Sequence, residues 1–126
     1  MNAFLHRVAL AAALTALCGA VSAADLKIHC EKRSTRSKVS VDGNNLRPGG
    51  AYFAVVSSGA NQAQTGVAAA VGDEVEFDLD SHAGDIAQGA VAIASNFIVD
   101  GRVSAQLRDA GGNVVASGSA ICRVRR

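Results

Sequence analysis

Tryptophan is absent from this sequence, and aromatic residues of any kind are scarce. Among its 126 residues there are four Phe, one Tyr and no Trp, so aromatic residues make up 4% of the chain. Lectins and single-strand nucleic-acid-binding proteins use aromatic side chains for stacking, and we therefore expect neither activity. The 12 Lys and Arg against 11 Asp and Glu also argue against a histone-like or strongly acidic protein.

The sequence motifs of the common enzyme classes are missing as well. There is no G-x-S-x-G nucleophile elbow, no P-loop, no G-x-G-x-x-G and no H-E-x-x-H. A Ser–His–Asp set can be assembled, for instance, from Ser81, His82 and Asp85, but a triad is defined by geometry that a sequence does not show. We therefore predict a non-enzymatic protein, with a small hydrolase, or an inhibitor of one, as an alternative.

The apolar run at the N-terminus covers only residues 8–17, whereas a helix that spans a bilayer needs about 20 residues. Arg7 precedes this run and the small residues 21–23 follow it, which is typical of a cleaved secretory signal peptide. We predict cleavage after Ala23 and export to the bacterial periplasm or the extracellular space, with no membrane span. A membrane anchor and a buried helix are the alternatives, and the residues before Cys18 do not match a lipoprotein signal.

The predicted mature chain, residues 24–126, has the length of a single domain. Without Arg7, its eleven basic residues balance its eleven acidic ones, so its net charge is zero. No Pro- or Ser-rich linker divides it, and it contains no repeat with a solenoid period. We expect one domain over residues 24–126.

Two cysteines, Cys30 and Cys122, remain in the mature chain. An exported chain with an even number of cysteines is expected to form disulfides, and here only one pairing is possible. This bridge would join the start of the domain to its end, and the chain-entropy model assigns such a loop roughly 4.6 kcal/mol. A redox or metal-binding pair is the alternative, although the two cysteines lack the C-x-x-C spacing.

Apolar and polar residues alternate with a period of two over most of the mature chain. The alternating or apolar segments are residues 26–31, 38–42, 52–56, 74–80, 103–108 and 120–125. This pattern indicates strands that bury one face, and turns rich in Gly and Asn separate them. Residues 60–71 have near-helical spacing that Gly66 opposes, and residues 84–94 read as a loop that leads into a strand near 91–93. We predict an all-β, antiparallel β-sandwich of about seven strands.

Two fragments resemble known modules. The segment Leu46-Arg-Pro-Gly-Gly-Ala-Tyr52-Phe-Ala-Val-Val56 resembles the L-x-P-G-x-Y turn and strand of bacterial prealbumin-like and Ig-like sandwiches. The segment Arg108-Asp-Ala-Gly-Gly-Asn-Val114 is similar to a hairpin of bacterial Ig-like domains. Together they cover less than a fifth of the chain, and the resemblance implies an Ig-like sandwich without implying any catalytic residue.

Charged residues are segregated along the mature chain although they sum to zero. Residues 25–47 carry six bases and three acids, residues 73–85 carry six acids and no base, and residues 102–126 carry five bases and one acid. The candidate basic patch, which a Cys30–Cys122 disulfide would gather, consists of Lys32, Arg33, Arg36, Arg123, Arg125 and Arg126. It would attract lipid head groups, an acidic polysaccharide or an acidic protein surface. The alternatives are a solvated face and cross-strand pairing with the acidic row.

The acidic row consists of Glu76, Asp78 and Asp80, which share one face of the predicted strand. Carboxylates bind Ca²⁺ when other oxygens complete the coordination, but a strand spaces same-face residues about 6.6–7 Å apart. The mature chain has two histidines, His29 on a polar strand face and His82 in a loop. A metal-binding protein that uses these residues is therefore an alternative, and a solubilising face with no cofactor is the simpler interpretation.

From these observations we expect a small exported module without enzymatic activity. It would contact a protein or polyanion partner through its edge strands or through the basic patch. Small β-sandwiches bind partners in this way, although the fold class alone does not determine the function.

Overall fold

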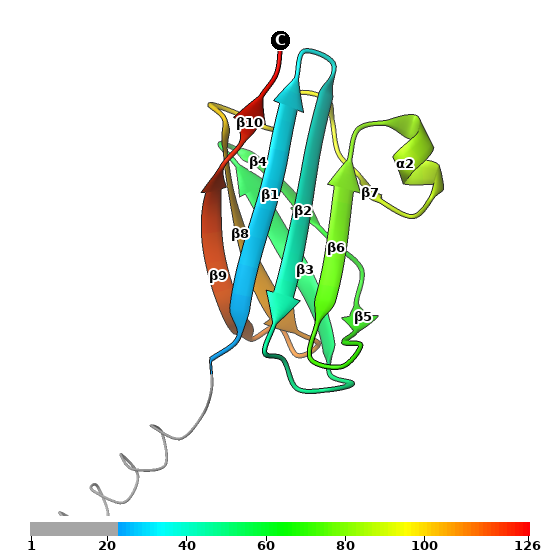
Figure 1. The fold of residues 1–126 in the computed structure, drawn as a ribbon, viewed down its shortest axis with the longest axis vertical. Coiled ribbons are helices and arrows are strands. Elements are labelled where there is room, and N and C mark those ends of the chain that lie inside the picture. Colours follow the sequence, from blue (N-terminus) through cyan, green and yellow to red (C-terminus); the bar gives the residue numbers. More distant parts are fainter. Residues whose placement is uncertain (1–22) are drawn as a thin grey trace, which may run out of the picture.

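A computed structural model describes residues 23–126 of the chain (Figure 1). The predicted signal peptide lies outside the described residues, except for its last residue, Ala23. Between residues 23 and 126, no helix has the length and apolar character needed to cross a membrane.

Two sheets form most of the described structure, which confirms the predicted β class. The elements are β1 (Asp25–Arg33), β2 (Arg36–Asn44), β3 (Ala51–Ser58), β4 (Asn61–Gln64), β5 (Ala68–Ala69), β6 (Val75–Asp80), α2 (Ala83–Ala87), β7 (Val91–Ala92), β8 (Arg102–Asp109), β9 (Val114–Ile121) and β10 (Arg123–Val124). The first sheet has the order β10-β1-β2-β6-β7, and the second has the order β4-β3-β8-β9 with β5 paired to β3. The pairs β1–β2, β2–β6, β3–β8 and β8–β9 are antiparallel, and the two sheets lie one behind the other (Figure 1).

The structure differs from the sequence prediction in its small elements. The described residues form ten strands where the alternation predicted about seven, because β5, β7 and β10 are two-residue segments paired with larger strands. The near-helical stretch 60–71 contains β4 and β5 and no helix. The stretch 84–94 contains the predicted strand as β7, but the five-residue helix α2 was missed. Short segments of this kind are set by tertiary contacts, since they are too short for a periodic pattern.

The core lies between the sheets and is built from the inward-facing residues of the long strands. Val39 and Val41 of β2, Leu79 of β6 and Leu107 of β8 are fully buried there. Burying such a side chain contributes about 1.5–3 kcal/mol. β9 faces β1 at one edge of the core, where a Cβ on Gly118 of β9 would lie in ordinary contact, 3.7 Å from Ile28 Cδ1 of β1. Small inward residues on β9 therefore let β1 approach closely.

The Leu46–Tyr52 segment forms the turn that leads into β3. Leu46 and Tyr52 are both buried, and the Arg47 amide donates a hydrogen bond to the Tyr52 hydroxyl at 3.2 Å. A Cβ on Gly50 would lie 2.8 Å from that hydroxyl, so only glycine fits beneath the ring. Gly49 has φ +73°, a conformation that glycine adopts without strain. The motif thus encodes a turn that anchors β3 in the core.

The Cys30–Cys122 disulfide is present, with 4.7 Å between the two Cα atoms, as the cysteine count predicted. Cys30 lies on β1 in the first sheet, whereas Cys122 lies between β9 of the second sheet and β10 of the first. The chain therefore changes sheets at Cys122, and the disulfide holds the two sheets together at this edge.

Candidate functional site

The outer face of the first sheet carries charged residues in cross-strand rows. One row runs from Arg123 on β10 through Glu31 and Lys38 to Asp80 on β6, so that its charges alternate in sign. Opposite charges on neighbouring strands favour this register. Part of the predicted acidic row is therefore neutralised by its neighbours on β2.

Two further rows place carboxylates close to one another. In one, Asp42 lies between Lys27 and Glu76, and in the other Ser40 lies between His29 and Asp78. A shared hydrogen bond with the Asp78 carboxylate and the charges of Asp78 and Asp42 raise the pKa of Glu76. Asp42 Oδ1 is buried and has no hydrogen-bond partner in the described part of the chain. The carboxylates of Asp42, Glu76 and Asp78 therefore repel one another on this face of the first sheet.

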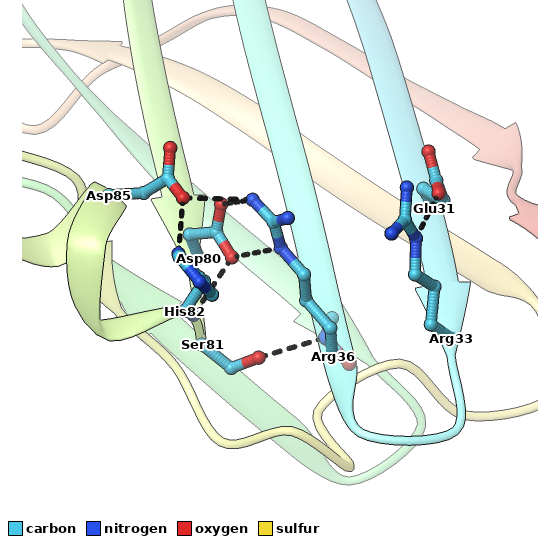
Figure 2. Close-up of polar contacts among 8 residues, drawn as sticks. Glu31, Arg33, Arg36, Asp80, Ser81, His82 and Asp85 are labelled. Carbon is cyan, nitrogen blue, oxygen red and sulfur yellow. Dashed lines mark hydrogen bonds and ion pairs between the residues drawn. The ribbon is translucent and has the colours of Figure 1, made fainter.

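The third member of the acidic row, Asp80, is 2% exposed and is held by Arg36. Arg36 Nε donates to Asp80 Oδ1 at 2.9 Å, and Nη2 donates to Asp80 Oδ2 at 2.6 Å (Figure 2). The His82 amide adds a third hydrogen bond, to Asp80 Oδ1 at 3.0 Å. Burial raises the pKa of Asp80, but the hydrogen bonds and charge of Arg36 with the His82 amide outweigh it, so the pKa lies below its usual value.

Helix α2 closes this network from the side. Arg36 Nη2 also donates to Asp85 Oδ2 at 3.0 Å, and the same Asp85 oxygen lies 2.8 Å from His82 Nδ1 (Figure 2). Asp85 and His82 are both more than a third exposed at their side chains, so the network reaches from a buried carboxylate to the surface. It fastens α2 and the end of β6 to the start of β2.

The structure brings only part of the hypothetical Ser–His–Asp set together. His82 and Asp85 are in contact, whereas the Ser81 hydroxyl accepts the Ser37 amide of β2 at 3.0 Å. Figure 2 shows the Ser81 side chain directed toward β2 and the His82 ring directed toward Asp85. Asp85 is shared with Arg36, which competes for the carboxylate that would orient a catalytic histidine. In this arrangement Ser81 and His82 help to dock α2 against β2.

The residues considered for metal binding are spread across the sheet. His29 lies on β1 and His82 precedes α2, while Asp80 is engaged by Arg36. Over residues 23–126, no three His, Cys, Asp or Glu side chains gather closely enough to hold one metal ion.

The two basic segments of the sequence meet at one end of the sandwich. β10 pairs with β1 in parallel, so that Arg123 lies opposite Glu31 and Val124 opposite Lys32. The Arg125 amide then donates to the Lys32 carbonyl at 2.8 Å. In Figure 1 the C-terminus and the β1–β2 turn lie at the same end of the molecule. We define the basic end as Lys32, Arg33, Arg123, Arg125 and Arg126.

The carboxylate of Glu31 lies within this basic end. Arg33 Nε donates to Glu31 Oε1 at 2.7 Å, and Arg125 Nε lies 3.5 Å from the same oxygen. The hydrogen bond from Arg33 and the positive charges of Arg33, Arg125 and Arg123 lower the pKa of Glu31. The five cationic side chains therefore outnumber the Glu31 carboxylate that contacts two of them. Arg36, which the sequence analysis grouped with them, is engaged by Asp80 and Asp85 instead.

A shallow hollow of about 1090 Å³ covers much of the outer face of the first sheet. It extends from Arg123 beside β1 to residues 88–91 next to β7, and residues of both charge signs line it. A ligand of one charge would meet both attraction and repulsion there, so the basic end is the more selective surface.

The roles of Glu31 and Asp85 were not predicted from the sequence. Glu31 organises two arginines of the basic end, and Asp85 completes the Arg36 network. Strand register decides both contacts, and only the charge alternation along β1 and β2 hinted at them. Comparisons with protein-family models, curated proteins and solved structures found no match for this chain. The function is therefore proposed from the geometry of the described residues.

Proposed function

We propose that this protein is a small exported binding module without enzymatic activity, whose basic end binds a polyanion. It would be an Ig-like sandwich in the bacterial periplasm or outside the cell, after removal of residues 1–23. The disulfide is consistent with an oxidising compartment. An acidic polysaccharide or a surface of anionic lipid head groups has the repeated negative charge that the basic end would recognise.

The convergence of two distant basic segments is the observation that supports this proposal. The disulfide joins residues 92 positions apart, and the pairing of β10 with β1 brings three C-terminal arginines beside Lys32 and Arg33. A cluster of cations attracts a polyanion by releasing its condensed counterions, and the affinity then falls as salt increases. Glu31 orients Arg33 and Arg125, which reduces the entropy that these side chains would lose on binding.

Retention of residues 24–126 on a heparin column tests the proposal. We expect binding at about 50 mM salt and elution in a salt gradient, because counterion release is most favourable at low salt. The variant Arg125→Gln/Arg126→Gln should elute at clearly lower salt. The control variant Lys27→Gln/Arg47→Gln removes the same charge from exposed positions outside the basic end and should elute close to the wild type.

Two results would overturn the proposal. One is the absence of retention at about 50 mM salt, where charge-driven binding is strongest. The other is equal weakening by both variants, which would show that net charge and not the basic end governs retention. Vesicles of anionic and of neutral lipid, tested in parallel, distinguish a lipid surface from a polysaccharide as the polyanion.

A further inference from the structure

β9 differs from every other strand at a sheet edge in the described residues. It is eight residues long, contains no charged residue and no proline, and pairs only with β8. The other edges are shorter, with two residues in β7, two in β10 and four in β4. Proteins commonly protect an exposed edge with charge, proline or shortness, because its free backbone groups pair readily with another strand. β9 lacks charge, proline and shortness. Its one irregularity is a β-bulge near its N-terminal end, where Val115 is left out between the pairs Leu107–Ala116 and Arg108–Val114.

The backbone of β9 presents alternate residues to the open edge. The Cys122 amide donates to the Gly101 carbonyl at 2.7 Å, next to the pairing of Ile121 with Arg102. In an antiparallel ladder this makes Ile121–Arg102 a pair without direct hydrogen bonds, so the backbone groups of Ile121 point away from β8. By alternation, the amides and carbonyls of Ser119 and Ser117 point to the open edge too, and the β-bulge at Val115 ends this alternation.

The sequence of β9 is self-complementary about Gly118. Residues 115–121 read Val-Ala-Ser-Gly-Ser-Ala-Ile, which is the same order from either end if Val and Ile are taken as equivalent. An antiparallel copy centred on Gly118 would set Val115 against Ile121 and Ser117 against Ser119. On the inner face it would set Ala116 against Ala120. Every side chain would thus meet one of its own kind, and no like charges would oppose each other.

We propose that a second copy of this chain pairs with β9 through an antiparallel, twofold-symmetric contact centred on Gly118. The two Ser117–Ser119 pairs would exchange two hydrogen bonds each, about four in all. The second sheets of two copies, with five strands each, would then form one continuous sheet of ten strands. Ile121, which is 77% exposed, would lie opposite Val115 of the other copy, which is partly buried against the core. A twofold contact closes on itself, so the expected assembly is a dimer and not a filament.

This pairing is independent of the proposed binding to a polyanion and would add to it. The basic end lies beyond the C-terminal end of β9, so a twofold axis through Gly118 would place the two basic ends at opposite ends of the dimer. Two sites on one particle bind a long polyanion more tightly than one, because the second contact is intramolecular.

Sedimentation velocity over a concentration series, with residues 24–126, tests the pairing and its register. The variant Ser117→Lys/Ser119→Lys changes two exposed side chains and sets Lys against Lys twice across the axis. We expect the dimer dissociation constant to rise at least about tenfold. The variant Ser117→Glu/Ser119→Lys sets Glu against Lys at both pairs, and its dimer should be as stable as the wild type or more stable. This second variant also controls for any effect of replacing the two serines.

A monomeric wild type at all concentrations would overturn the proposal, and heparin binding by that monomer would leave the proposed function intact. A dimer that both variants retain would show that β9 is not the interface. A dimer that both variants lose would overturn the register about Gly118, since a shifted register no longer sets the introduced Glu against the introduced Lys. Larger aggregates in place of a dimer would contradict the closed twofold contact.

Discussion

The two sheets expose very different outer faces. Every strand of the first sheet except β7 carries charged residues, whereas in the second sheet β8 alone carries them, as Arg102, Arg108 and Asp109. Opposite charges alternate along one row of the first sheet, from Arg123 to Asp80, whereas another row sets Asp42 beside Glu76. The second sheet has rows of the neutral residues Gln, Ser and Val. Charge makes a surface selective for charged ligands, and its absence on β9 leaves that edge open to another strand.

The largest expected effect comes from disconnecting the two sheets. The variant Cys30→Ala/Cys122→Ala removes the bridge between β1 and the end of β9, which closes a loop of 92 positions. We expect the free energy of unfolding to fall by about 2–4 kcal/mol, because the unfolded chain gains freedom. Because the chain has no Trp, the loss is measured by urea denaturation followed by circular dichroism. Reduction of the wild type should give the same loss, and a loss below about 1 kcal/mol would show that the sheets hold together without the bridge.

A smaller loss of stability is expected when the Arg36–Asp80 ion pair of the first sheet is broken. Asp80→Asn would leave Arg36 without its bidentate partner, although Asp85 would remain. We expect about 2–3 kcal/mol less stability, since a partly buried charge loses most of its compensation. The control Asp78→Asn, on the same face but exposed, should change stability by less than about 0.5 kcal/mol. Equal effects of the two substitutions would contradict a special role for Arg36–Asp80.

The Arg36–Asp80 ion pair also predicts how the free energy of unfolding depends on pH. The pKa of Asp80 is lowered in the folded protein, so its contribution is fully present above the unfolded value of about 3.9. It is lost as the pH falls through the lower folded pKa. The difference in stability between the wild type and Asp80→Asn should therefore be constant at neutral pH and should narrow below about pH 4. A difference that widens in acid would have the wrong sign for this explanation.

The smallest change in stability is expected at Glu76, which lies on the same face of the first sheet as Asp80. Here the substitution should stabilise the protein and not destabilise it. Because Asp78 and Asp42 raise the pKa of Glu76, its charged form is disfavoured in the folded state. Glu76→Gln should therefore stabilise the protein at pH 7 by at most about 0.5 kcal/mol, and the gain should vanish below about pH 4. Thermal unfolding at both pH values measures it. A loss of stability at neutral pH would show that Glu76 makes a favourable contact that outweighs the repulsion.

The long strands and the disulfide were predictable because local patterns encode them. Alternation at Val75, Phe77 and Leu79 marked β6, and the count of two cysteines allowed one pairing. The five-residue α2 and the two-residue β7 were harder to predict, since neither is long enough to show a periodic pattern of apolar residues. Arg36 illustrates the same limit in the candidate site. Its sequence neighbours suggested a member of a basic patch, and only the register of β2 with β6 revealed Asp80 as its partner.

The sequence by itself determined the β class, the disulfide pairing and the separation of charge into two basic segments and one acidic segment. Each of these features follows from the composition of the chain or from the spacing of residues along it, and neither depends on contacts between distant strands. Only the tertiary structure decided which charges meet, because contacts between strands join residues such as Arg36 and Asp80 that are 44 positions apart. It also decided that β9 lies at an edge. The Val-Ala-Ser-Gly-Ser-Ala-Ile sequence was visible from the start, but self-complementarity has a consequence only for a strand whose backbone is still free to pair.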